Sequence, residues 1–290
     1  MIPSIFLFVL LFGGANAALI KYAGAKISPI DLVFFRSVIA AVAIAPFIGK
    51  IELTKFKNDP KSLTLAGLLF AANWILFAYG IQKTSVIMGQ LIYVPTSLIV
   101  AGLGYFILKE KLSQKEIIGL ILSLVGITYL ILGSFKTKDI LSFGTPFGNF
   151  LVVVALFSWA FYLVLTRKIS NNYKPLTIIF VDFIISGLIS AIFFILNFRN
   201  LSLTTFNINL IMAILAIAFL SSIAFFFLNQ WIVKHSSAFV SSMLLYPVTL
   251  SAIIYGIIFF KEKLDVSLLI GGFIMLIGVF LSTLDTIRKK

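Results

Sequence analysis

Two stretches of the chain are copies of each other: PTSLIVAGLGYFILKEKL at residues 95–112 and PVTLSAIIYGIIFFKEKL at residues 247–264. A shift of 152 residues extends the match without a gap from 85–126 to 237–278, and twelve of these 42 positions are identical. The identities include a proline, three glycines and the tetrapeptide Lys-Glu-Lys-Leu. In an apolar chain such matches are rarer than those of Leu or Ile, so the chain consists of two similar halves.

The composition places both halves in a membrane. Of 290 residues, 61% are apolar, 15% aromatic and 11% charged, and the mean hydropathy is +1.13. Soluble domains contain about 45–50% apolar and ~25% charged residues, so the excess apolar surface must face lipid. Cysteine is absent and histidine occurs once, at His235. We therefore expect no disulfide, no Cys or His metal site and no cofactor.

Ten stretches are long enough, at ~20 residues each, to cross the hydrocarbon as helices. Because five is odd, two five-helix repeats enter the membrane inverted relative to each other, an arrangement typical of secondary transporters that work by alternating access. We predict an all-α integral membrane protein with repeats at 1–133 and 147–290 and a connecting loop at 134–146. The spans have approximate bounds 2–20, 30–48, 62–82, 84–108, 113–132, 147–166, 175–196, 207–233, 236–260 and 264–285.

The positive charges predict the orientation. The net charge is +13, and most Lys and Arg lie between the apolar runs, which is typical of membrane loops and not of nucleic-acid binding. Fourteen lie on the side of the N-terminus and eight on the opposite side, so both termini are expected in the cytoplasm, with the chain in the cell inner membrane. The first span is expected to be retained, because no Lys or Arg precedes its apolar run as in a signal peptide.

Motifs along the chain follow a known family pattern. The first helices contain Phe12-Gly13, Lys21, Pro29 and Arg36, where the family has Trp-Gly, Lys, Pro and Arg. Each half then has a small hairpin motif, a proline in its fourth helix and a Lys-Glu-Lys-Leu end where the family has Gly-Glu-x-Leu. On these motifs the whole chain resembles the ten-helix EamA type of the drug/metabolite transporter superfamily. The motifs lie at Thr84-Ser85, Pro95 and 109–112, and at 236–238, Pro247 and 261–264.

Amides and aromatic residues within the apolar spans predict a central substrate cavity. Asn73, Trp74 and Phe77 share one face of the third span, and the 152-residue shift relates this face to the eighth span. Polar residues inside hydrocarbon tend to face the bundle interior. The alternative is that the polar residues only join helices and that the aromatic residues belong to an aromatic belt at the membrane surface. The resemblance implies that helices one, three, four, six, eight and nine surround the cavity. The predicted cavity residues are Asn16, Asn73, Trp74, Phe77, Gln90, Tyr93, Trp159, Tyr162, Phe226, Asn229 and Ser242.

Two prolines are predicted hinges. Pro95 and Pro247 occupy equivalent places inside spans four and nine. A proline inside a span frees a carbonyl group and kinks the helix. The alternative to a hinge is a fixed packing kink.

Five charged residues are candidates for coupling or gating. Asp182, the deepest acid, indicates a proton site or a cation partner, or else an ion pair with Arg36 or Lys168. Lys21 either extends to the membrane surface or takes part in anion attraction or gating. Glu110 and Glu262 each lie between two lysines, which is consistent with a solvated local ion pair or with a gate latch.

The predicted function is secondary transport. The chain has no phosphate loop, zinc helix motif or nucleophile elbow, so ATP-driven transport is not expected. The alternatives are coupling to an ion gradient, with H+ as the candidate ion, exchange of solutes, and uncoupled transport. The cavity, with little fixed charge, suits a zwitterionic or neutral small molecule such as an amino acid or a derivative, and the resemblance implies export. The alternatives are a permease that imports a metabolite or cofactor and, less favoured, a membrane enzyme, a channel or a scaffold.

Glycines on spans five and ten predict close helix packing. Gly119 and Gly126, with Gly271 and Gly278, recur at seven residues on one face of each span. Small residues let helices approach closely. These faces are candidates for packing within the chain or for a dimer contact, so we expect a monomer or a homodimer.

Overall fold

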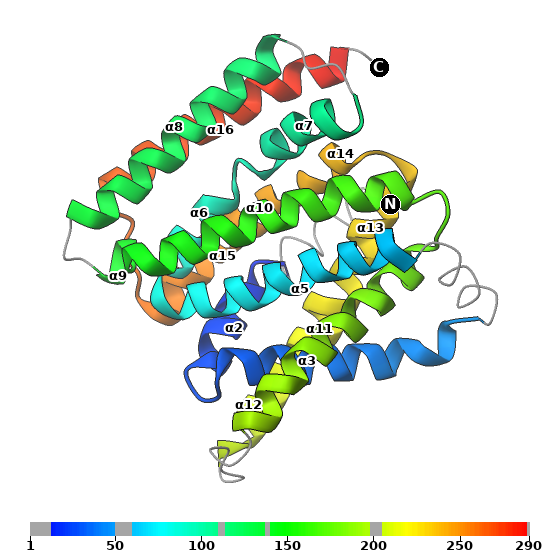
Figure 1. The fold of residues 1–290 in the computed structure, drawn as a ribbon. Helices are drawn as coiled ribbons and strands as arrows, with labels where there is room; N and C mark the ends of the chain where they lie inside the picture. The colour runs from blue at the N-terminus through cyan, green and yellow to red at the C-terminus, as the bar shows by residue number, and fades with distance from the viewer. Residues whose placement is uncertain (1–12, 50–59, 110–113, 137–139, 198–204, 289–290) are drawn as a thin grey trace.

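All regular structure in the described part of the chain is helical, which confirms the predicted all-α class. The computed structural model describes residues 13–49, 60–109, 114–136, 140–197 and 205–288. The helices (Figure 1) are α2 (Ala15–Gly24), α3 (Pro29–Ile44), η2 (Ala45–Phe47), α5 (Pro60–Lys83), α6 (Val86–Tyr93), α7 (Thr96–Ile107), α8 (Gln114–Lys136), α9 (Ile140–Phe143), α10 (Pro146–Ile169), α11 (Pro175–Asn197), α12 (Ile208–Ala216), the π-helix η5 (Ile217–Ala224), α13 (Phe225–His235), α14 (Ala238–Ser242), α15 (Leu245–Phe260) and α16 (Val266–Arg288).

Within these ranges, eight helical segments are long and apolar enough to cross a membrane. A shorter apolar helix, Val266–Gly278, lies within α16. Helix α2 falls in the first predicted span, whose start lies outside the described residues. The total of ten spans therefore stays a prediction.

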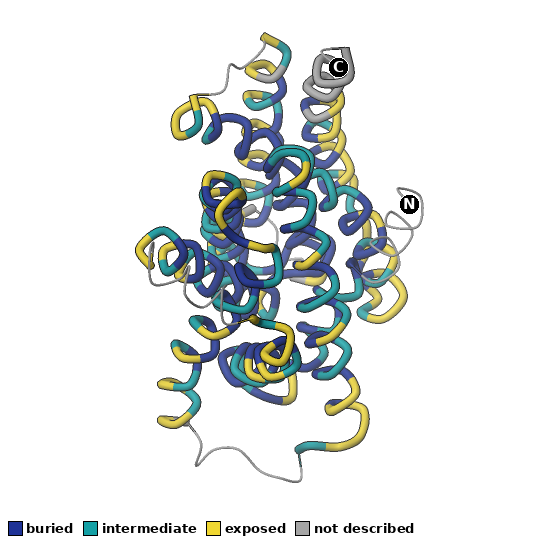
Figure 2. The backbone as a smooth tube through the Cα atoms, turned by 90° about the vertical axis from the view of Figure 1, so that its right-hand side faces the viewer, coloured by how far each residue is buried: buried dark blue, intermediate teal, exposed yellow. Residues whose placement is uncertain are grey.

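Burial follows the pattern of a bundle in lipid. Large apolar side chains are exposed on the outside, for example Phe106 at 77% and Leu196 at 75%. Polar side chains such as Asp182, Asn229 and Gln230 are fully buried. Figure 2 shows the buried residues concentrated along the centre of the bundle and the exposed ones on its outer faces. Because exposed apolar groups are stable only in an apolar solvent, this distribution supports a membrane environment.

Spans at equivalent places in the two halves pair with each other. Helix α3 packs on α11 and α8 on α16, and in spans four and nine α6 packs on α15 and α7 on α14. Figure 1 shows α8 and α16 side by side at one end of the bundle. A Cβ atom on Gly119 would meet the carbonyl oxygen of Gly278, and one on Gly278 would meet that of Gly119 at 2.5 Å. The two glycine faces therefore pack against each other within the chain, with the helices antiparallel.

The repeated hairpin motif begins a helix in each half. Ser85 Oγ accepts a hydrogen bond from the Met88 amide at 2.9 Å, and Ser237 Oγ accepts one from the Val240 amide at 3.1 Å. These N-caps satisfy amides that the helix leaves unpaired. Both capped spans are then interrupted, between α6 and α7 at Pro95 and between α14 and α15 just before Pro247. Whether these breaks act as hinges stays a prediction.

Candidate functional site

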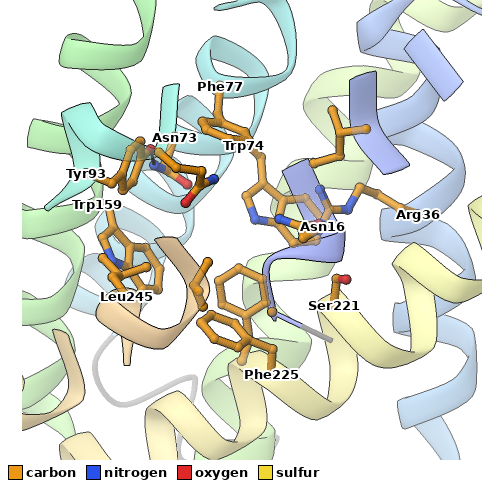
Figure 3. Close-up of a pocket in the computed structure, with 15 residues that line it drawn as sticks. Asn16, Arg36, Asn73, Trp74, Phe77, Tyr93, Trp159, Ser221, Phe225 and Leu245 are labelled. Atoms are coloured by element: carbon orange, nitrogen blue, oxygen red, sulfur yellow. Dashed lines mark hydrogen bonds between the residues drawn. The ribbon is translucent and has the colours of Figure 1, made fainter. Parts of the chain in front are cut away.

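A central cavity lies where helices of both halves meet. Its walls come from α2, α3, α5 and α6 of the first half and from α10, η5, α13 and α15 of the second. Figure 3 shows the lining side chains converging on it. Of the predicted cavity residues, those that line it are Asn16, Asn73, Trp74, Phe77, Gln90, Tyr93, Trp159 and Phe226.

Three predicted cavity residues lie behind the wall. Tyr162 stacks on Trp159 with ring centroids 5.0 Å apart and is fully buried. Ser242 donates to the Phe239 carbonyl at 2.6 Å. Asn229 is also fully buried, and neither polar atom of its side chain has a hydrogen-bond partner among the described residues.

Aromatic rings form much of the wall. Phe226 contacts Trp74 and Trp159, with ring centroids 5.5 Å apart in both pairs. Phe225, which is the repeat counterpart of Asn73, also lines the cavity. The 152-residue shift identifies it, but among 31 phenylalanines its type alone does not mark it. Ser221, Leu245 and Val248 line the cavity too and were not expected.

Asn73 fixes the position of Tyr93. Its amide nitrogen donates to the Tyr93 hydroxyl at 2.6 Å and to the Ala155 carbonyl at 2.8 Å. The second bond joins α5 to α10, across the two halves. The Tyr93 ring meets Phe77 edge to face, with centroids 5.5 Å apart. These contacts leave the donors of the Asn73 amide occupied, so it shapes the wall.

Arg36 also lines the cavity. Its side chain is only 2% exposed, and its guanidinium carbon lies 3.6 Å from the centroid of the Trp74 ring. Its Nε and Nη2 atoms donate to Ser222 Oγ at 3.2 and 3.0 Å. Ser222 in turn donates to the Ile217 carbonyl, five residues earlier, at 2.8 Å within η5. Single π-helical turns occur frequently at functional sites.

Asp182 belongs to a separate buried network. The Tyr162 hydroxyl donates to Asp182 Oδ2 at 2.5 Å, and the Gln230 amide nitrogen donates to the Tyr162 oxygen at 2.9 Å. Asp182 Oδ1 has no hydrogen-bond partner in the described part of the chain. An ion pair of Asp182 with Arg36 or Lys168 is absent among the described residues. Tyr162, which binds this carboxyl group, stacks on Trp159 of the cavity wall.

A charged cluster lies next to the cavity, where α2 leaves it. Lys21 follows the cavity residue Ile20, and its ammonium group donates to the Thr84 carbonyl at 2.7 Å and to Glu262 Oε1 at 3.0 Å. The Glu262 carboxylate also accepts from the amides of Val86 at 2.7 Å and Ile87 at 3.0 Å. An acid at this place satisfies the unpaired amides of α6 and complements the positive end of the helix dipole.

Local backbone geometry brings Glu262 into this place. Lys261 ends α15 in the left-handed region at φ 52°, which turns the chain inward. A Cβ atom on Gly256 would lie 2.7 Å from Glu262 Oε2, so the glycine leaves room for the carboxylate. Glu262 is 4% exposed and is therefore not a solvated pair with its neighbouring lysines. Lys109 has a similar φ of 56°; Glu110, next to it, lies outside the described residues.

A family model described as the EamA-like transporter family matches residues 2–132 and again 146–284. The chain is 27% identical over 278 residues to an uncharacterized transporter, YyaM, of Bacillus subtilis (strain 168), covering 93% of this chain and 89% of the relative. It is 26% identical over 289 residues to an uncharacterized transporter of Methanothermobacter thermautotrophicus, covering 93% and 82%.

Two further similarities bear on function and fold. A protein of Salmonella typhimurium named "Probable amino-acid metabolite efflux pump" is 25% identical over 227 residues, which cover 75% of this chain and 73% of the relative. A solved crystal structure matches with a TM-score of 0.69 at 15% identity, covering 99% of this chain and 97% of that one. At this identity the structural match supports the fold alone.

Proposed function

Because the chain belongs to the EamA-like transporter family, we propose that it exports a small amphipathic organic molecule by alternating access. The observation that carries the proposal is the central cavity, whose walls come from both halves of the chain. When inverted halves rock against each other, a site between them opens to each side in turn. The walls combine aromatic rings with amides and one cation, which suits a molecule with an apolar body and a polar end.

The Lys21–Glu262 cluster is proposed as a gate. It joins α2 and α6 of the first half to the end of α15 in the second. If both termini are cytoplasmic, as the charge distribution predicts, the cluster lies at the outer end of the cavity. Its breaking would then open the cavity to the outside, and its re-formation would close that path.

An amino acid or a derivative is the proposed class of substrate, and export the proposed direction. The named relative from Salmonella supports both. The alternative is import of a metabolite or cofactor, which the same cavity would permit because alternating access runs in either direction. Asp182 is the proposed proton site if transport is coupled to H+. The proposed location is the inner membrane.

Reconstituted transport tests the proposal. The purified protein would be placed in proteoliposomes loaded with a pooled metabolite mixture, and the movement of each solute followed by mass spectrometry with and without a pH gradient. We expect selective, saturable movement of one class of small molecule. Trp74→Leu and Gln90→Ala should reduce it at least ~10-fold, whereas the lipid-facing control Phe106→Leu should not.

Other outcomes point to other functions. Currents that do not saturate with solute concentration indicate a channel. Unchanged transport in both cavity variants contradicts the cavity assignment. If no solute moves selectively, the transport proposal fails for the molecules tested.

A further inference from the structure

Arg36 places a positive charge in the cavity wall without an acidic partner. Among the described residues Arg36 forms no ion pair, and its polar and aromatic contacts are the Ser222 hydroxyl and the face of Trp74. A hydroxyl and an aromatic face stabilise a cation but do not neutralise it. Because a buried charge is costly unless it is paired, this site favours an anionic group supplied by a ligand.

A second observation indicates a ligand with acceptor atoms. Trp159 is 3% exposed and lines the cavity, yet its indole N–H has no partner among the described residues. Figure 3 shows Arg36 and Trp159 on opposite sides of the cavity, with Trp74 between them and Phe225 below. Donors therefore lie at both ends, and aromatic surface lies in the middle. Buried donors of this kind are normally satisfied.

The cavity offers a positively charged group neutral acceptors but no acid: the Asn16 amide oxygen and the Ser221 hydroxyl line it and have no hydrogen-bond partner among the described residues. Its wall contains no aspartate or glutamate, and Asp182 lies behind Trp159 and Tyr162, bound to the Tyr162 hydroxyl. An ammonium group in the cavity would meet Arg36 without a compensating carboxylate. The sequence predicted a cavity with little fixed charge, with Arg36 as a candidate for coupling or gating, whereas Arg36 lies in the cavity wall.

We infer that the transported molecule is an organic carboxylate with a compact apolar or aromatic body, bound to Arg36 through its carboxylate. The guanidinium group binds carboxylates through paired N–H donors, and the body lies against Trp74, Phe225 and Phe226. A monocarboxylate without an amino group should bind more tightly than the corresponding amino acid. The inference rests on the proposed transport function and narrows its substrate class.

Binding of four matched probes tests the inference. Phenylpropanoate, phenylpropanamide, phenylalanine and 3-phenylpropylamine share one body and differ in charge. Tryptophan fluorescence reports binding, because two of the three tryptophans line the cavity, and Trp231→Phe removes the third. We expect phenylpropanoate to bind at least ~10-fold more tightly than the amide, the loss typical of one charged hydrogen bond. Phenylalanine should fall between them, and the amine should bind weakest.

Variants at Arg36 assign this preference to the guanidinium. Arg36→Met should abolish the preference for the carboxylate over the amide. Arg36→Lys keeps the charge and should retain part of it, which covers the case in which the Met variant does not fold. Lys168→Gln removes one exposed positive charge elsewhere and should leave the preference unchanged.

The outcomes separate this inference from the proposed function. Equal binding of the carboxylate and the amide, tighter binding of the amine, or no binding of any carboxylate overturns the inference. Proteoliposomes that transport amides or amines as well as acids also overturn it, while transport itself stands. Carboxylate binding that depends on Arg36, without transport of any solute, supports the site and contradicts the transport function.

Discussion

The carboxylate of Glu262 and the ammonium group of Lys21 lie 3.0 Å apart, although 241 residues separate them in the chain. The same carboxylate binds two backbone amides at the start of α6. One side chain of the second half thus holds a side chain and a helix end of the first. The left-handed backbone of Lys261 and the missing side chain of Gly256 together let Glu262 reach the start of α6.

Replacing Glu262 by Gln should weaken this junction. The neutral amide removes the ion pair and places an NH2 group against one of the two backbone amides. We expect a loss of about 2 kcal/mol in the free energy of unfolding, measured by thermal unfolding in detergent, together with slower transport. Lys263→Gln, at an exposed neighbour, serves as the control. An unfolding midpoint unchanged from the original protein would show that the junction contributes no stability.

Gly256→Ala should reproduce that defect without touching a charge. The added methyl group would lie 2.7 Å from Glu262 Oε2 and 3.0 Å from Ile87 Cγ1, so the carboxylate must move off α6. Transport should fall in parallel with the Glu262→Gln variant. The matched control is Gly102→Ala, where the new methyl group makes an ordinary contact of 3.4 Å with Leu120. If both alanines behave alike, the space beside Glu262 is not the cause.

Substitutions of Asn73 and Tyr93 should reduce the stability of the protein by different amounts. Tyr93→Phe removes one hydrogen bond but leaves Asn73 bound to the Ala155 carbonyl, so we expect a loss of about 1 kcal/mol in stability. Asn73→Ala leaves both the Tyr93 hydroxyl and the Ala155 carbonyl without this donor. It should therefore lower the free energy of unfolding by more than Tyr93→Phe does. Thermal unfolding of the two variants side by side measures the difference. The reverse order would mean that Asn73 does not organise the wall.

Asp182→Asn tests proton coupling. Asparagine keeps the shape and an oxygen for the Tyr162 hydroxyl but removes the acid. If Asp182 carries the coupled proton, accumulation driven by a pH gradient should fall at least ~10-fold, while exchange of substrate at equal pH continues. Asp31→Asn, at an acid near the start of α3, is the control. Normal accumulation in the Asp182 variant would remove the proton role from this residue.

The repeat in the sequence predicts several structural details. Ser85 and Ser237, identical under the shift, are the two N-caps. Of the two matched prolines, Pro95 lies at the break in its span and Pro247 in the first turn after the break. The amides of Asn16, Asn73 and Gln90 were predicted to face inward, since hydrocarbon excludes them, and all three line the cavity. These features are local, or follow from the preference of single residues for polar surroundings.

Other features have no local signal. The π-helix η5 contains neither proline nor glycine, so nothing in its sequence marks it. The hydrogen-bond partner of Arg36, Ser222, lies 186 residues away in the chain, and the ion-pair partner of Glu262, Lys21, lies 241 residues away. Only the packing of the two halves brings these partners together. Phenylalanine faces lipid and cavity alike, so Phe225 could be assigned only through its repeat partner.

The glycine contacts between α8 and α16 have a consequence for the origin of the chain. Gly119 meets Gly278 and Gly126 meets Gly271. The repeat converts one pair into the other, because Gly271 is the counterpart of Gly119 and Gly126 that of Gly278. Such reciprocity is the mark of a self-complementary surface, as in a two-fold homodimer. A half-length ancestor inserted in both orientations would already have possessed this interface. Fusion of two copies into one gene would then have fixed their ratio and orientation without any new contact.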